Sequence, residues 1–131
     1  MSGMTDLDQL LTSMNPKLID GEFVFCTVQG DYEQYARLTP LATFRESEGL
    51  TLVIDKNDAI NAGLSFEASF QQITLSVHSS LEAVGLTTAV ATKLTSNNIS
   101  ANVIAAYYHD HIFVPTDKAQ LALIALAEFR Q

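Results

Sequence analysis

Two histidines and an aspartate stand together near the end of the sequence, at His109-Asp110-His111. Two imidazoles separated by one residue lie on the same face of a strand and can coordinate a metal ion when a third ligand joins them. The sequence offers no obvious third ligand. The prevailing interpretation is a polar hairpin turn with Asp110 at the bend, and the alternative is that His109 and Asp110 form hydrogen bonds to a ligand.

A second group of candidates belongs to a helix start and to the strand that follows the helix. A start at Gly85-Leu86-Thr87 leaves backbone N–H groups unpaired and exposes the positive end of the helix dipole, which suits a carboxylate. The Asn102 amide both donates and accepts, so it suits the ammonium and carboxylate of an amino acid. Each has a structural alternative, because every helix has such an end and Asn102 could simply bond to the preceding loop. The predicted ligand-binding residues are Gly85, Leu86, Thr87, Asn102, His109 and Asp110.

A helix and a β-hairpin must position these residues. Asn97 and Asn98 tolerate the left-handed conformation that ends helices, and they follow an apolar stripe of helical spacing. The helix starts either at Gly85 or at the capping-box sequence of residues 79–82. A strand over 101–108 and a return over 112–114, ended by Pro115, are expected next.

The rest of the chain predicts three further helices and four further strands. The expected helices are 7–14, one that has Asp55 as its N-cap and ends at Gly63, and one after Thr116. The expected strands are 23–28, 41–45 paired with 50–54, and an extended stretch over 66–78, in which Ile73 and Leu75 face the helices and Thr74 faces the other way. A loop with one helical turn is expected over 30–40. This order favours an α+β fold of ferredoxin-like type, with antiparallel sheets covered by helices on one face, in two fused halves: 1–65 and 66–131.

Composition narrows the function. The chain has 131 residues, 47% of them apolar, and seven scattered cations against fifteen acidic residues give a net charge of −8. Nucleic acid and anionic membranes need clustered cations, so neither is an expected partner. The N-terminus has no basic, apolar signal sequence, and a cytoplasmic location is expected. Cys26 is expected to be a small buried hydrophobe.

No known catalytic motif occurs in the sequence. The carboxylates of Arg45-Glu46-Ser47-Glu48 could act as acid and base, but adjacent charges at a hairpin tip are usually solvated. The sequence therefore predicts a protein that is not an enzyme and needs no cofactor.

The last helix carries more apolar surface than one sheet can cover. Leu121, Ile124 and Ala125 continue around it beyond the face made by Ala119, Ala122, Leu123, Leu126 and Phe129. Exposed apolar patches usually mark an interface, so self-association as a homodimer is predicted.

Several stretches resemble a known family, the ACT domain, a regulatory amino-acid-binding module. They are residues 79–86 before the helix, 97–104 after it, and 109–115; together with 44–51 they resemble a small bacterial family of stand-alone tandem ACT-like proteins. The resemblance implies a βαββαβ pattern and an effector site near the loop from the first strand to the first helix, here residues 78–85. The second half has no strand after its last helix, so that strand must come from the N-terminal half or be absent.

The resemblance and the residues together predict a regulatory or sensor protein that binds a small, amino-acid-like ligand at a domain or subunit interface. One alternative is a protein-interaction module that binds no ligand. Another is a metal-dependent hydrolase that uses His109 and His111.

Overall fold

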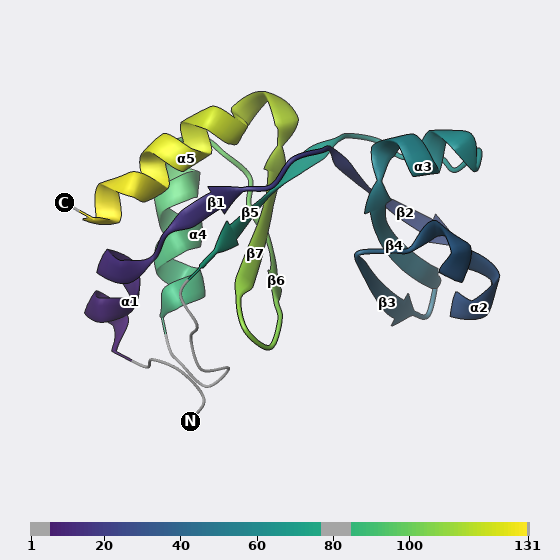
Figure 1. The fold of residues 1–131 in the computed structure, drawn as a ribbon, viewed down its shortest axis with the longest axis horizontal. Helices are drawn as coiled ribbons and strands as arrows, with labels where there is room; N and C mark the ends of the chain where they lie inside the picture. The colour runs from purple at the N-terminus through teal and green to yellow at the C-terminus, as the bar shows by residue number, and fades with distance from the viewer. Residues whose placement is uncertain (1–5, 77–84, 131) are drawn as a thin grey trace. The chain divides into compact units, whose positions relative to one another are not determined.

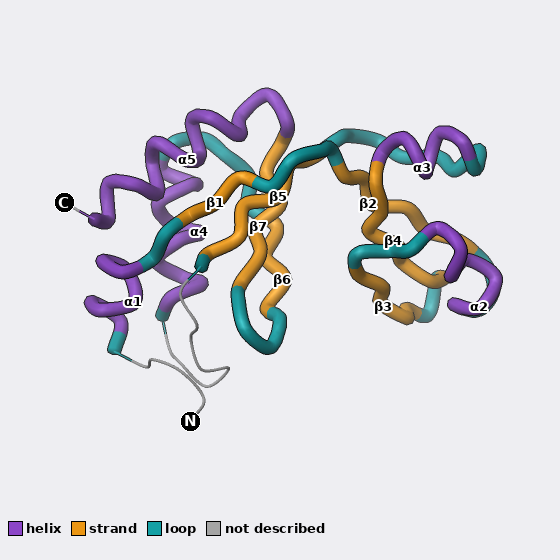
Figure 2. Tube along the Cα trace, viewed as in Figure 1, coloured by secondary structure: helices purple, strands orange, loops and turns teal. Residues whose placement is uncertain are grey.

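The chain forms two compact units, seen in a computed structural model that describes residues 6–76 and 85–130. Unit 2 is residues 21–70, and unit 1 is made of the described residues of 1–20 and 71–131. Both are α+β units of ferredoxin-like type, with helices on one face of an antiparallel sheet, as predicted (Figures 1 and 2). The predicted division into repeats at residues 65 and 66 stays a prediction. Among the described helices, none is both long and apolar enough to cross a membrane.

Unit 1 has four strands in the order β1-β5-β7-β6. They are β1 (Pro16–Leu18), β5 (Phe70–Leu75, whose first residue belongs to unit 2), β6 (Asn102–Ala105) and β7 (Asp110–Pro115). Its helices are α1 (Leu7–Ser13), α4 (Leu86–Ser96) and α5 (Ala119–Ala127), with short 3₁₀ helices at Thr116–Lys118 and Glu128–Arg130. The predicted strand over 66–78 is therefore shorter than expected at its start, and residues 77 and 78 lie outside the described part.

The strand that the second half seemed to lack comes from the N-terminal segment. Pro16 and Leu18 of β1 pair with Leu75 and Ile73 of β5 in an antiparallel ladder. The sequence had indicated only a helix end at Asn15-Pro16. Proline is tolerated here because it is the first residue of an edge strand, where its missing N–H removes little pairing.

The core of unit 1 joins this N-terminal segment to the C-terminal helices. Leu10 and Met14 are fully buried with residues of β5, α4, β7 and α5. The buried set is Leu10, Met14, Ile73, Leu75, Leu86, Val90, Leu94, Ile99, Ile112, Val114, Ala119, Ala122, Ala125 and Leu126. Burial of this apolar surface is what fixes α1 to unit 1, because the hydrophobic effect follows the area removed from water.

The C-terminal helix α5 matches the expectation of an incompletely covered surface, with one correction. Leu121 and Ile124 are 54% and 62% exposed. Ala125 was expected on the same outer surface, but it is buried against the core because it lies one turn after Ala122 on the inner face, next to Leu126.

Unit 2 has three strands in the order β3-β4-β2, and Phe70 pairs with Phe23 beside them. They are β2 (Phe23–Val28), β3 (Ala42–Glu46) and β4 (Gly49–Asp55). The helices are α2 (Tyr32–Tyr35), continued by a 3₁₀ helix at Ala36–Leu38, and α3 (Lys56–Asn61). The predicted hairpin between 41–45 and 50–54 is confirmed, and its charged tip is exposed. Cys26 is buried, and this burial raises the pKa of its thiol.

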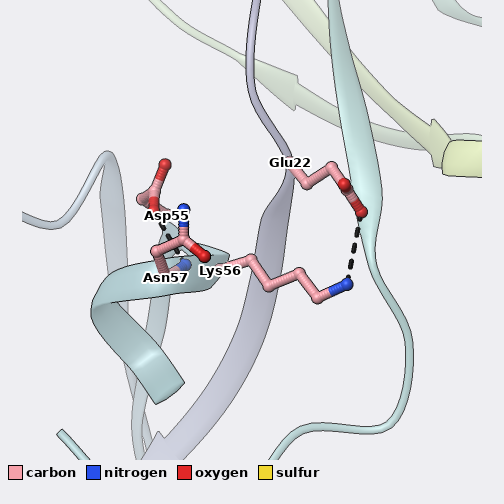
Figure 3. A network of polar contacts seen from close by, with 4 residues as sticks. All are labelled: Glu22, Asp55, Lys56 and Asn57. Atoms are coloured by element: carbon pink, nitrogen blue, oxygen red, sulfur yellow. Dashed lines mark hydrogen bonds and ion pairs between the residues drawn. The ribbon is translucent and has the colours of Figure 1, made fainter. Parts of the chain in front are cut away.

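The start of α3 is fixed by polar contacts, shown in Figure 3. The Asp55 carboxylate accepts hydrogen bonds from the backbone N–H groups of Asn57 at 2.8 Å and Asp58 at 3.3 Å. Lys56 forms an ion pair with Glu22, with 3.4 Å between Nζ and Oε1. Asp55 is thus the helix N-cap that the sequence predicted.

Candidate binding site

The β6–β7 hairpin holds half of the candidate residues, but its turn lies elsewhere than expected. Ala105 pairs with Asp110, and the turn occupies residues 106–109, closed by a hydrogen bond from Ala106 N to His109 O at 3.0 Å. The prediction of a bend at Asp110 is therefore wrong, because Asp110 is the first residue of β7. The register is set by the core: Val103 pairs with Ile112 on the helix-covered face, and a shift of one residue would turn one of the two away from it.

Two tyrosines form the turn. Tyr107 and Tyr108 are 64% and 62% exposed, and their rings meet edge to face with centroids 5.0 Å apart. They had been expected within a strand, pointing to opposite faces. Because they sit in the turn instead, both rings lie at the tip of the hairpin.

His111 is held by two polar residues of β5. Gln72 Nε2 lies 3.1 Å from His111 Nδ1, Thr74 Oγ1 lies 2.9 Å from the same atom, and Gln72 also donates to Thr74 at 2.9 Å. An amide N–H₂ can only donate, so Nδ1 accepts and the neutral ring carries its proton on Nε2. Burial lowers the pKa of His111, with a further lowering by His109 and an opposing effect of Asp110.

Gln72 and Thr74 were not among the predicted site residues. The sequence did indicate that Thr74 alternates with Ile73 and Leu75 and so faces away from the helices, and Gln72 shares that face. The missing information was the pairing of β5 with β7, which joins residues far apart in the sequence.

Asp110 is a buried carboxyl group, 9% exposed, and burial raises its pKa while His111 and His109 lower it to a smaller extent. His109 is partly buried, with its ring centroid 6.3 Å from that of His111. The structure therefore brings His109 and His111 together beside the turn, whereas Asp110, two residues before Ile112, belongs to the helix-covered face of β7.

Asn102 lies at the opposite end of the hairpin. It pairs with Phe113, and its Nδ2 donates to the Phe113 carbonyl at 3.2 Å. This is a structural hydrogen bond, as the alternative reading expected, although its acceptor is β7 and not the preceding loop. Three register positions separate Asn102 from Ala105, a span of about 10 Å along a strand.

The start of α4 confirms one of the two predicted positions. Gly85 is the N-cap, in the left-handed conformation with φ +98°, and as a glycine it has no side chain to cap the helix. Thr87 is exposed, but Leu86 is buried in the core, so a ligand could meet only its backbone. A Cβ atom on Gly85 would lie 3.1 Å from Leu7 Cδ2, which places α1 directly against this helix start. The predicted capping box at 79–82 and most of the predicted effector loop at 78–85 lie outside the described residues.

The two parts of the site lie at one end of unit 1. In Figure 1 the hairpin turn and the first turn of α4 are both at the lower end of the unit. Gly85, Thr87, His109 and Asp110 therefore belong to one end, whereas Asn102 does not.

A metal site finds no support among the residues that the structure describes. No three His, Cys, Asp or Glu side chains gather there in a way that could hold an ion. His111 also uses Nδ1 for its contacts with Gln72 and Thr74.

The fold and these sequence features define a tandem ACT-domain protein, and the chain belongs to the ACT-domain family. A model of the ACT domain matches residues 2–71, and a second ACT-domain model matches residues 67–128. No curated protein matches the chain.

Solved structures agree. A Vibrio cholerae protein of unknown function, described as a possible transport protein, is 61% identical with a TM-score of 0.89, covering 95% of this chain and 96% of that one. The regulatory subunit of aspartate kinase from Thermus thermophilus, in its ligand-free form, has a TM-score of 0.62 at 7% identity, covering 91% and 99%. Aspartate kinase from Clostridium acetobutylicum has a TM-score of 0.65 at 9% identity, covering 90% of this chain and 34% of that one. At such low identity, the two kinase proteins share the fold alone with this chain.

Proposed function

We propose that this protein is a non-catalytic regulatory or sensor protein of ACT type, located in the cytoplasm, that binds a small amino-acid-like ligand. The observation that carries the proposal is the pair of ACT-domain matches on one short chain, because ACT domains are regulatory modules. The similarity of the fold to aspartate kinase regulatory subunits supports it.

The ligand site is assigned to the end of unit 1 that holds the α4 start and the hairpin turn. The N–H groups that follow Gly85 receive the ligand carboxylate, because the helix dipole favours an anion there and the N-cap glycine has no side chain with which to cap them. His109 and Asp110 contribute from the hairpin. Leu86 takes part through its backbone only, because its side chain is buried. Asn102 lies at the far end of its hairpin, so it either contacts a ligand bound to a second subunit or does not take part.

A thermal-shift screen with the free amino acids tests the proposal. A ligand at a hundred times its dissociation constant adds about 2.7 kcal/mol of stability. A flat response to the whole set would contradict ligand binding.

One variant on α4 tests where the ligand binds. Thr87→Glu puts a carboxylate in the first turn, where it suits the helix dipole but repels the ligand's own carboxylate. Thr92→Glu is the matched control, an exposed threonine further along α4. We expect Thr87→Glu to abolish the ligand-induced thermal shift and Thr92→Glu to leave it unchanged. If the two changes have equal effects, the ligand does not bind at the α4 start.

The proposed quaternary structure is a homodimer formed through α5. Leu121 and Ile124 are the exposed large apolar side chains of this helix, and a second copy would remove both from water. Light scattering at micromolar concentration should give twice the 14.3 kDa chain mass. Leu121→Glu combined with Ile124→Glu should halve it, and Leu41→Glu, at a residue 50% exposed in unit 2, should not. A wild-type chain that is monomeric at every concentration would refute the dimer.

A further inference from the structure

The sheet of unit 1 has a face opposite its helices, and polar side chains from three neighbouring strands meet on it. Lys17 of β1 lies directly opposite Thr74 of β5 in the antiparallel ladder, and Thr74 Oγ1 lies 2.9 Å from Nδ1 of His111 on β7. Residues beside these in sequence, such as Ile73 and Ile112, belong to the core on the other face. Lys17 and His111 are therefore two strand spacings apart, about 10 Å, with their side chains on one face. We call this surface the polar face, and its residues are Lys17, Gln72, Thr74 and His111.

The polar face carries a positive charge, although the chain as a whole has a net charge of −8. The four described strands of unit 1 contain one acidic residue, Asp110, and it belongs to the helix-covered face. They contain one basic residue, Lys17, and its side chain is exposed. Because none of these strands places a carboxylate on the polar face, the charge of Lys17 favours an anion there.

His111 adds a hydrogen-bond donor whose direction is fixed. Gln72 Nε2 lies 3.1 Å from Nδ1 of His111 and also donates to Thr74. An amide N–H₂ group only donates, so Nδ1 accepts and Nε2 of the neutral ring carries the proton. Gln72 is only 7% exposed, which keeps this contact away from competing water. Two side chains of the neighbouring strand thus hold His111 in one tautomer, with Nε2–H as its donor.

Packing alone does not require this network. A buried amide is unfavourable unless it is hydrogen-bonded, and apolar groups of the same shape can replace a hydrogen-bonded pair at little or no cost in stability. Strands β5 and β7 use such residues on their other face, where Ile73 and Ile112 are fully buried. What Gln72 and Thr74 provide in addition is one orientation and one tautomer of His111, which a contact with a ligand needs.

We propose that the polar face of unit 1 binds an oxyanion, the carboxylate or phosphate group of a small molecule, between Lys17 Nζ and His111 Nε2. Lys17 supplies the charge, His111 donates a hydrogen bond, and Gln72 is a positioning residue that acts through His111. Hydrogen bonds to an ionised acceptor are stronger than those between neutral groups. The site goes beyond the function proposed above, because the α4 start belongs to the helix-covered side of the same sheet, where Leu86 is buried in the core.

Three small probes test the charge and the class of the ligand at constant pH and ionic strength. Acetate and acetamide have nearly the same shape and differ in charge, and inorganic phosphate represents the second class of oxyanion. The ¹⁵N resonance of His111 Nε2 reports on binding at this nitrogen. We expect acetate or phosphate to shift it saturably, and acetamide to leave it unchanged. The anion that binds more tightly identifies the class. No shift with either anion, or an equal shift with acetamide, would overturn the proposal.

Variants of the two ligand-binding residues test the assignment, with affinities taken from the backbone resonances of β5 and β7. Lys17→Gln removes the charge at an exposed position and should weaken anion binding about two- to fivefold. His111→Asn keeps an acceptor for Gln72 and Thr74 but removes the Nε2 donor, so the affinity should fall about tenfold or more. Lys118→Gln, the same loss of charge in the 3₁₀ helix after β7, is the control and should have little effect. Unchanged affinity in both Lys17→Gln and His111→Asn, or an equal loss in Lys118→Gln, would refute the site.

A variant of Gln72 tests its positioning role. Gln72→Leu keeps a side chain of similar size but removes the donor, so both ring nitrogens of His111 should share the proton. Their ¹⁵N chemical shifts measure the tautomer directly, and anion affinity should fall about two- to fivefold. A wild-type ring protonated on Nδ1, or a variant with unchanged tautomer and affinity, would refute this role.

One more variant separates this site from the α4 start, which also attracts anions. Thr87→Glu should leave phosphate and acetate binding at the polar face intact, even where it abolishes the thermal shift caused by an amino acid. Anion binding that Thr87→Glu abolishes and Lys17→Gln leaves unchanged would place the anion at the α4 start and overturn the polar-face site alone. A flat amino-acid screen together with a shift of the His111 resonance by an anion would overturn only the function proposed above.

Discussion

Met14→Ala tests whether the N-terminal segment belongs to unit 1. Met14 precedes unit 2 in the sequence, but it is fully buried in the core that α1 shares with β7 and α5. Removing most of such a side chain costs about 2–5 kcal/mol, because the lost contacts leave a cavity. The opening equilibrium of unit 1 should therefore rise by at least about thirtyfold.

Two probes read the units separately. Hydrogen exchange of residues 110–115 follows β7 in unit 1, and labelling of the buried Cys26 thiol follows unit 2. We expect Met14→Ala to accelerate exchange in β7 and to leave thiol labelling close to the wild-type rate. Leu121→Ala, at a residue 54% exposed on α5, is the control and should change either rate little. Faster Cys26 labelling with unchanged exchange in β7 would show that α1 stabilises unit 2 instead, and would refute the assignment.

The remaining predictions concern titration and backbone conformation. The folded-state pKa of His111 is lowered, so its contribution to stability is complete above the unfolded pKa of about 6.5 and is lost as the pH falls below it. The unfolding free energy measured in urea should therefore rise from pH 5 to pH 8, and His111→Asn should reduce this dependence on pH. An unchanged dependence on pH in the variant would contradict this. The folded-state pKa of Asp110 is raised, so the chain loses stability as the pH rises above about 3.9. Asp110→Asn should therefore raise the urea concentration at the unfolding midpoint at pH 7. A lower midpoint would mean that the carboxylate is paired. Gly49→Ala should destabilise the protein by about 1–3 kcal/mol, because φ is +154° and the new Cβ would lie 2.8 Å from a backbone oxygen. Gly63→Ala is the control and should cost less, because φ is +72° and the new Cβ would meet nothing within 4 Å. Equal decreases in melting temperature for the two variants would argue against the close contact at Gly49.

Local patterns in the sequence were enough for the elements whose two faces differ. Ile73 and Leu75 alternate with Thr74, and this pattern correctly predicted which side of β5 meets the helices. Asp55 was likewise recognised as an N-cap, and Gly85 was one of the two expected helix starts, since both features depend on neighbouring backbone groups.

The misplaced features depend on contacts between distant residues. The stretch from Val103 to Val114 is apolar on both faces apart from its His-Asp-His, and the turn was therefore predicted at these polar residues. The register is decided instead by the pairing of Val103 with Ile112. The contact of His111 with Gln72 spans 39 residues, and the pairing of Pro16 with Leu75 is longer still. Nothing in three residues such as Pro16–Leu18 indicates a strand until its partner is known.

The placement of β1 reverses the usual order in which a growing chain acquires structure. Unit 2 is continuous in sequence, so all its residues are available once residue 70 has left the ribosome. The segment that precedes unit 2, with Leu10 and Met14, finds its full set of partners only after β7 and α5 have been made. Domains generally fold from the N-terminus during synthesis. Here the apolar side chains of Leu10 and Met14 stay open to chaperones or to a neighbouring chain until α5 has been synthesised.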